Sequence, residues 1–150
     1  MRLVIQRVTN ATVVINNAES RSIKSGLVVF AGIENADTAD DVQWLSKKVM
    51  AMRIFNDAEG KMNCSLVDTG GALMVISQFT LHALTKKGNR PSFIRAAHPD
   101  FALQLYLQFI NQLKEDGCTS IVTGEFGASM QVSLTNDGPV TIVLDSKVKE

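Results

Sequence analysis

The stretch GLVVFAGIENADTADDVQWLSKKVM, residues 26–50, joins a buried strand to an amphipathic helix and decides the fold class. Residues 26–33 form a short apolar run of the kind found in strands that are covered on both faces. Asp37 and Thr38 offer a helix cap, because their side-chain oxygens can accept hydrogen bonds from the free amides of a first turn. Apolar residues then recur at helical spacing, at Val42, Leu45, Val49 and Met52. A strand followed by the helix that covers it predicts a mixed α/β domain.

Strand patterns flank this unit on both sides. Toward the N-terminus, residues 2–8 and 11–15 predict two short strands joined near Asn10. Toward the C-terminus, the predicted strands are 72–81, 119–123, 130–135 and 140–145. We therefore expect residues 1–150 to form a single domain, with mixed and strongly curved β-sheet and two main amphipathic helices.

The second helix is predicted to begin at Pro99 and to end at Gly117. Proline is favoured at the first helical position, and glycine is favoured just after the last turn. Between them, the apolar residues expected on one face are Phe101, Leu105, Phe109 and Leu113.

Composition narrows the classes of function. A hydrophobic fraction of 45% in 150 residues is enough to build a core without disulfides or metal. The formal net charge is zero, which excludes a broadly basic nucleic-acid binder and restricts any RNA contact to a local patch. Cys64 and Cys118 lie too far apart for a CxxC pair, and the two histidines form no HExxH motif. We expect both cysteines to be buried or inert, and no metal or cofactor.

The N-terminus MRLVIQRV lacks the apolar segment of a secretory signal. The longest apolar run, residues 27–33, is far shorter than the roughly 20 residues of a membrane helix. The sequence therefore predicts a soluble, cytoplasmic protein.

SQFTL, residues 77–81, places hydroxyl, amide and aromatic side chains at the end of an apolar strand. If the strand continues, Thr80 and His82 lie on the same face, because side chains alternate along a strand. A histidine can activate a hydroxyl nucleophile, so the two residues could form a nucleophile and base pair. Spacing alone favours the simpler explanation that Thr80 and Gln78 satisfy backbone groups where the strand ends.

Two other stretches could contact a ligand. KKGNRPSF, residues 86–93, gathers Lys86, Lys87 and Arg90 around a turn, which suits either a phosphate contact or a solvated loop. In TGEFGASM, residues 123–130, Phe126 could stack on a ring or fill the core, and the sequence does not separate these two roles.

The pair Gly138 and Pro139 stands directly before the strand pattern 140–145. Glycine tolerates backbone angles that other residues avoid, and proline fixes φ and lowers the energy of a cis bond. Only about 5–6% of X-Pro bonds in folded proteins are cis, so the sequence pattern alone favours an ordinary trans turn that enters the strand.

Taken together, SQFTL at 77–81 and NDGPVT at 136–141 resemble the paired signature of D-aminoacyl-tRNA deacylases. The resemblance covers nearly the whole chain, in order and at similar spacing, through MRLVIQRV at the start, RIFND at 53–57, GKMN at 60–63, GNRPSF at 88–93 and TGEFGASM at 123–130. His82 and Leu84 depart from the family, in which an aromatic and an acidic residue are more usual. This departure concerns the rim of the pocket.

The resemblance implies chiral proofreading, in which the ester joining a D-amino acid or glycine to the terminal adenosine of tRNA is hydrolysed. It also implies a homodimer with its active site at the subunit interface, where Gly138 and Pro139 of one subunit enter the pocket of the other in cis form. Two carbonyls beside a cis bond could hold the α-ammonium of the substrate. The side chain of an L-amino acid would then strike this backbone, whereas glycine could not be excluded.

The resemblance also implies how the reaction proceeds. Backbone amides around Phe79 and Thr80 stabilise the oxyanion, and water attacks with help from the ribose 2′-hydroxyl. Thr80 then positions the substrate and is not acylated. The site residues implied are Ser77, Gln78, Phe79 and Thr80 for the chemistry, Gly138 and Pro139 for chirality, and Lys86, Lys87 and Arg90 for the acceptor stem.

Two alternatives stay open at this level. One is an esterase that uses Thr80 and His82 on small D-amino acid esters or peptides. The other is a non-catalytic module that binds RNA or a small molecule.

Overall fold

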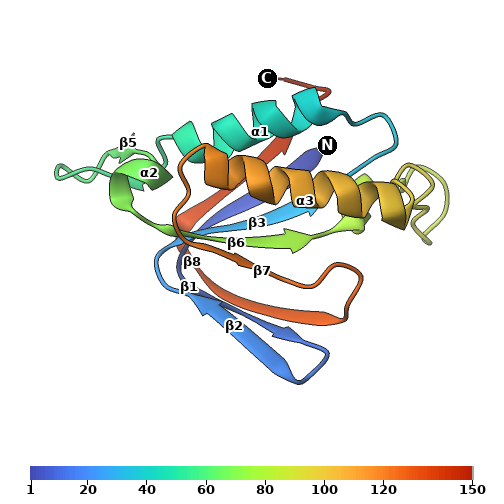
Figure 1. Ribbon diagram of the computed structural model, residues 1–150, viewed down its shortest axis with the longest axis horizontal. Helices are drawn as coiled ribbons and strands as arrows, with labels where there is room; N and C mark the ends of the chain where they lie inside the picture. Colours follow the sequence, from blue (N-terminus) through green and yellow to red (C-terminus); the bar gives the residue numbers. More distant parts are fainter. Residues whose placement is uncertain (150) are drawn as a thin grey trace.

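The computed structural model describes residues 1–149 and is built around a curved sheet with its long helices on one face (Figure 1). In chain order the elements are β1 (Arg2–Ile15), β2 (Glu19–Ile23), β3 (Gly26–Gly32), α1 (Ala39–Ala51), β4 (Phe55–Asn56), β5 (Met62–Cys64), α2 (Leu66–Thr69), β6 (Ala72–Ser77), the 3-10 helix η1 (Phe79–His82), α3 (Pro99–Glu115), β7 (Ile121–Thr123) and β8 (Met130–Asp145). Helices α1 and α3 pack against each other across the sheet. The mixed α/β class and the two main helices are confirmed.

The main sheet has six strands in the order β2-β1-β3-β6-β7, and β8 pairs with β1. Strands β3, β6 and β7 run parallel to one another. Strand β1 is antiparallel to β2, β3 and β8. A small hairpin of β4 and β5 stands apart from this sheet.

Strand β1 is continuous, so the predicted division into 2–8 and 11–15 is wrong. Its first half, Arg2 to Val8, pairs with β3, and its second half, Ala11 to Ile15, pairs with β2. Strand β8 follows both halves on the other edge. Because one strand serves two neighbours in succession, it bends, and the sheet curls until it is nearly closed.

Strand β8 is also continuous where two strands were predicted. In the ladder between the two strands, Gln6 of β1 pairs with Thr141 of β8, and Val8 of β1 pairs with Asn136 of β8. The residues between Asn136 and Thr141 therefore bulge out of the ladder. This bulge contains Gly138 and Pro139.

Two apolar clusters fill the molecule. The larger lies between the sheet and the helices α1 and α3, and the smaller lies inside the curl of the sheet. On α3, Leu105, Phe109 and Leu113 are buried as expected, but Phe101 is 37% exposed. Ala102 and Tyr106 are buried as well. In the first turn of α3, the residue that faces the sheet is therefore Ala102 and not Phe101.

The three predicted helix ends are confirmed. Thr38 is the N-cap of α1, and its amide donates to the Asp41 carboxylate at 2.8 Å. Pro99 begins α3, and Gly117 follows it with φ of 103°. No helix within residues 1–149 is long and apolar enough to cross a membrane.

The cysteines are unpaired. Cys118 is buried, and burial raises the pKa of its thiol, so it is protonated and unreactive at neutral pH. The expectation that the cysteines are buried or inert is therefore confirmed for the burial of Cys118. Cys64 is only half-buried.

The end of the chain is tied to the start of α1 by ionic contacts. The Lys147 ammonium donates to the Asp41 carboxylate at 2.7 Å and to the Ala36 carbonyl at 2.8 Å. Burial opposes ionisation of Asp41, but hydrogen bonds from Lys147, Ser146 and Thr38 outweigh it and hold the pKa of Asp41 well below its ordinary value of 3.8. The ionised carboxylate therefore stabilises the folded state.

We expect Asp41→Asn to lower the free energy of unfolding at pH 7 by about 2 kcal/mol, because a charged hydrogen-bonded pair is lost. Because folding lowers the pKa of Asp41, its ionised carboxylate stabilises the folded protein at pH values above 3.8, the ordinary pKa of the group. This stabilisation decreases as the pH falls below 3.8. Urea unfolding at pH 7 and pH 3 should show the difference from wild type shrinking at the lower pH.

The matched control is Asp40→Asn, which removes an exposed carboxylate from the same helical turn. We expect it to change the free energy of unfolding by less than about 0.5 kcal/mol. Equal losses in the two variants, or a difference for Asp41→Asn that does not change with pH, would contradict the role given to Asp41.

Candidate active site

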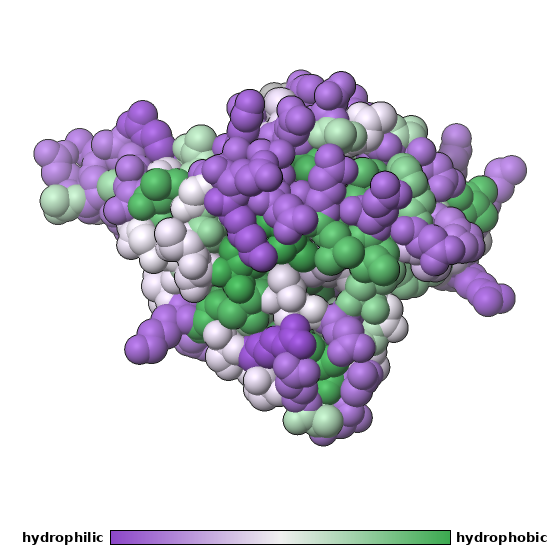
Figure 2. Space-filling view, viewed as in Figure 1, coloured by the Kyte–Doolittle hydropathy of each residue, from purple (hydrophilic) through white to green (hydrophobic). Residues whose placement is uncertain are grey.

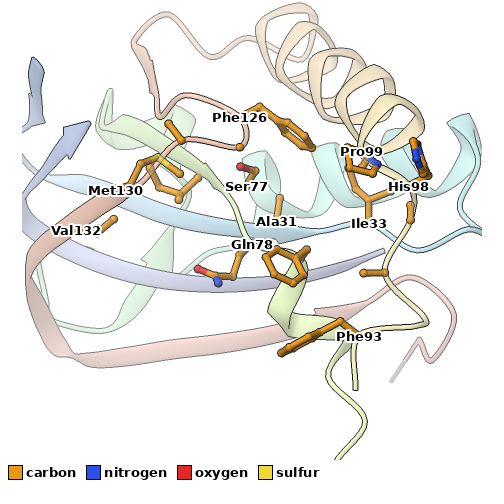
Figure 3. Close-up of a pocket in the computed structure, with 17 residues that line it drawn as sticks. Ala31, Ile33, Ser77, Gln78, Phe93, His98, Pro99, Phe126, Met130 and Val132 are labelled. Carbon is orange, nitrogen blue, oxygen red and sulfur yellow. The ribbon is translucent and has the colours of Figure 1, made fainter. Parts of the chain in front are cut away.

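A cleft of about 660 Å³ lies at the carboxyl ends of the parallel strands β3, β6 and β7 (Figure 3). Its walls come from the ends of β3 and β6, from residues 126–128 after β7, from the start of β8 and from the beginning of α3. Hydrophobic side chains are exposed between α3 and the lower part of the sheet, and polar surface surrounds them (Figure 2). Clefts at the carboxyl ends of parallel strands are frequent ligand sites.

The register of β3 and β6 places the SQFTL stretch in this cleft. Ala31 pairs with Ser77 at the last step of the ladder, and the Gln78 amide then donates to the Ala31 carbonyl at 2.8 Å. Beyond this point the Ile33 carbonyl accepts from the Ala97 amide at 3.0 Å, and the chain after Gln78 turns into η1. The prediction that the strand continues to residue 81 is therefore wrong.

Three of the four residues predicted for the chemistry line the cleft. Ser77 and Gln78 are half-buried, and Phe79 is 58% exposed and contacts Phe93 edge to face at 5.1 Å. Thr80 is not among the lining residues, and its hydroxyl oxygen accepts a hydrogen bond from the Gln78 side-chain amide. Thr80 is thus held through Gln78.

His82 does not pair with Thr80. It lies at the end of η1 rather than on a strand, so the expected alternation of faces does not apply. The ring is 1% exposed, and neither nitrogen has a hydrogen-bond partner among residues 1–149. A base must accept a proton through one of these nitrogens, and the geometry gives neither nitrogen access to Thr80 or to the cleft.

The basic residues lie outside the cleft on an exposed loop. Lys86, Lys87 and Arg90 are exposed and form no ion pair within the described part of the chain. The loop is closed by backbone hydrogen bonds between Leu84 and Ser92, at 2.8 and 3.0 Å.

Arg95 anchors the end of this loop. Its guanidinium donates to the Glu34 carboxylate at 2.8 Å. Burial raises the pKa of Glu34, but the hydrogen bond and charge of Arg95 outweigh it, and the pKa lies below its ordinary value. The ion pair fixes the segment that brings Phe93 and His98 to the cleft wall.

Gly138 and Pro139 lie away from the cleft of their own chain. Both are exposed, and neither is among the cleft-lining residues. The bond between them is cis, and Gly138 has φ of 134°. The buried guanidinium of Arg7 holds the base of this bulge by donating to the Asp137 carbonyl at 3.0 Å and to the Ile54 carbonyl at 2.6 Å.

Several cleft residues were missed or left undecided by sequence reasoning. Phe126 lies on the cleft wall, half-buried, with its ring 5.8 Å from that of Tyr106. The Tyr106 hydroxyl donates to the Val75 carbonyl at 2.8 Å, and burial raises its pKa. Met130 and His98 also line the cleft, and their only sequence signal was proximity to a strand start and a helix start.

The lining is chiefly apolar, with few polar groups. Within residues 1–149, no cluster of three or more histidine, cysteine or acidic side chains is placed to bind a metal ion. Such a cleft can hold a ring against its aromatic side chains and orient a polar group near Ser77 and Gln78.

Comparison with known proteins gives a consistent result. The model of the family described as "D-Tyr-tRNA(Tyr) deacylase" matches residues 4–145. Proteins named D-aminoacyl-tRNA deacylase from Flavobacterium johnsoniae and Akkermansia muciniphila are 53% and 56% identical to this chain, with full coverage of both partners. A solved structure described as "c-Myc DNA Unwinding Element Binding Protein" is 38% identical, with a TM-score of 0.91 over 97% of this chain and 98% of that one.

Buried His82 provides a test of the site geometry. We expect His82→Phe to leave the free energy of unfolding unchanged or to raise it by up to about 1 kcal/mol, because the ring shape is kept and two unpaired polar atoms are removed. Urea unfolding at pH 7 measures this. His98→Phe, at an exposed position, is the control and should change stability by less than about 0.5 kcal/mol. A clear loss of stability in His82→Phe would mean that the ring nitrogens have a bonding partner.

Proposed function

The chain belongs to the D-Tyr-tRNA(Tyr) deacylase family, and we propose on this basis that it hydrolyses the ester between a D-amino acid and tRNA. The observation that supports the proposal most is the match across residues 4–145, joined to full-length identity above 50% with proteins named for this activity. The cleft supports it further, because Ser77, Gln78 and Phe79 meet there.

The proposed reaction needs no cofactor. The oxygen of a water molecule bonds to the ester carbonyl carbon, and the bond between that carbon and the ribose oxygen breaks. The ribose oxygen takes up a proton from the water, assisted by the neighbouring 2′-hydroxyl. The amides of Phe79 and Thr80 are the first of η1, and neither donates to another backbone or side-chain group of residues 1–149. They are therefore available to stabilise the oxyanion. Thr80, held by Gln78, positions the substrate and is not acylated.

The substrate is proposed to span the cleft and the basic loop. Gln78 and Phe79 line the region of the terminal adenosine and the ester, where aromatic rings suit an unpaired base. Lys86, Lys87 and Arg90 contact the acceptor-stem phosphates, which need only a local patch of charge in a chain whose net charge is zero. Acting on aminoacyl-tRNA, the protein works in the cytoplasm.

Chiral selection is proposed to require a second copy of the chain. Gly138 and Pro139 are exposed on a bulge and do not line their own cleft, so they can meet the substrate only if another subunit supplies them. In a homodimer, the bulge of one subunit would enter the cleft of the other. There it would leave no room for the side chain of an L-amino acid, and glycine, which has no side chain, would pass the same filter.

The direct test of this function compares the two mirror-image esters. We expect the protein to hydrolyse D-tyrosyl-tRNA at least 100-fold faster than L-tyrosyl-tRNA, with ester loss followed under single-turnover conditions. Equal hydrolysis of both would contradict selection by exclusion. Saturable tRNA binding without hydrolysis of either ester would instead support a binding module.

We expect Gly138→Ala to reduce the ratio of D- to L-ester hydrolysis by at least about tenfold. A Cβ at Gly138 would lie 2.8 Å from Val140 Cγ2 and 3.1 Å from Arg7 Nη2, at a φ that L-residues rarely adopt, so the bulge must change shape. Gly117→Ala is the control, since it has φ of 103° with no atom within 4 Å and lies after α3. An unchanged ratio in folded Gly138→Ala would count against the assigned role.

A further inference from the structure

The turn that follows β6 leaves no room for a side chain at Gly32. A Cβ built on Gly32 would lie 2.9 Å from the Gln78 carbonyl oxygen and 2.9 Å from Leu81 Cβ, distances that real Cβ atoms essentially never show. Gly32 does not have a positive φ, so its conformation is open to other residues. The need for glycine here is therefore steric, because only a residue without a side chain lets β3 touch this turn.

The His82 ring also borders the space at Gly32. Its Cδ2 atom would lie 3.2 Å from the Cβ built on Gly32, and the ring is 1% exposed. Because neither ring nitrogen has a partner among residues 1–149, the ring contributes by its shape rather than by hydrogen bonding.

Two consecutive residues of β3 thus define where the turn lies. The Ala31 carbonyl accepts from the Gln78 amide at 2.8 Å, and Gly32 faces the Gln78 carbonyl. Gln78 and Phe79 then project into the cleft, and the Gln78 side chain holds Thr80. A shift of the turn would move all three together.

We propose that Gly32 and the His82 ring form a seat that fixes the Gln78–Thr80 turn, and that both are positioning residues for ester hydrolysis. The inference rests on the proposed function. Neither residue lines the cleft, and the His82 ring is 1% exposed, so we expect both to act through the turn rather than by contact with the substrate. Their effect falls on the rate of the chemical step, because displacement of reacting groups by about 1 Å can cost roughly 100-fold.

The test measures single-turnover hydrolysis of D-tyrosyl-tRNA over a range of protein concentrations. Gly32→Ala should lower the maximal rate constant by roughly 100-fold, while the protein concentration at half-maximal rate changes less than about threefold. Gly71→Ala is the matched control. Its Cβ would also meet an atom at 2.9 Å, but that atom is Leu66 Cδ1, at the end of a side chain that does not line the cleft. Its rate constant should equal that of wild type.

The outcomes separate the two proposals. An inactive wild-type protein would overturn the proposed function. If the wild type is active and a folded Gly32→Ala variant has the same maximal rate constant, the seat is overturned and the proposed function stands. The same conclusion follows if Gly32→Ala changes only the protein concentration at half-maximal rate.

A second pair of variants keeps the test decisive if Gly32→Ala does not fold. His82→Ala removes the ring and should lower the maximal rate constant by at least about tenfold with little change in the half-maximal concentration. His82→Phe restores a ring and should recover most of that loss. Equal rates for His82→Ala and wild type would overturn the seat, and so would failure of His82→Phe to recover the rate, since that would assign the nitrogens a chemical role.

Discussion

The parallel pairing of β3 and β6 is the constraint on which the rest of the site depends. Its last steps, Ala31 with Ser77 and then the Gln78 amide with the Ala31 carbonyl, end both strands at the same edge of the sheet. Residues after β7 and the start of α3 reach the same edge, and the cleft forms where they meet. Gly32 lets the turn after β6 lie against β3, so the SQFTL stretch turns into the cleft instead of continuing as a strand.

The curl of the sheet follows from a different constraint. Strand β1 pairs with β3 along its first half and with β2 along its second, and β8 accompanies it throughout. This arrangement buries a second apolar cluster inside the curl. It also places the bulge of Gly138 and Pro139 midway along β8, where the Arg7 guanidinium donates to the Asp137 carbonyl at the base of the bulge. The bulge and the cleft therefore belong to separate regions of one chain, which is why the proposed chiral filter requires two copies.

Charge has a local role in this protein. The net charge is zero, yet Lys86, Lys87 and Arg90 are exposed and form no ion pair within residues 1–149, whereas Arg95 is held by the buried carboxylate of Glu34. Arg95 thus fixes the segment that forms part of the cleft wall, whereas the neighbouring basic side chains are the ones proposed to contact a polyanionic ligand. The apolar cleft and the adjacent basic loop together suit a substrate with a small ester end and a long phosphate backbone.

The amino-acid sequence by itself determined the helices, because their caps and apolar spacing are local: Thr38, Pro99 and Gly117 mark ends that the structure confirms. It also identified the SQFTL stretch and the Gly-Pro pair through resemblance to a family. Only the tertiary structure decided that 2–15 is one strand, that Thr80 and His82 do not pair, and that Phe126 and His98 line the cleft. These features depend on partners distant in the chain, such as β8 for β1 and Gly32 for the turn after β6. Local propensity cannot report where a strand loses its neighbour, because that neighbour is brought there by the fold.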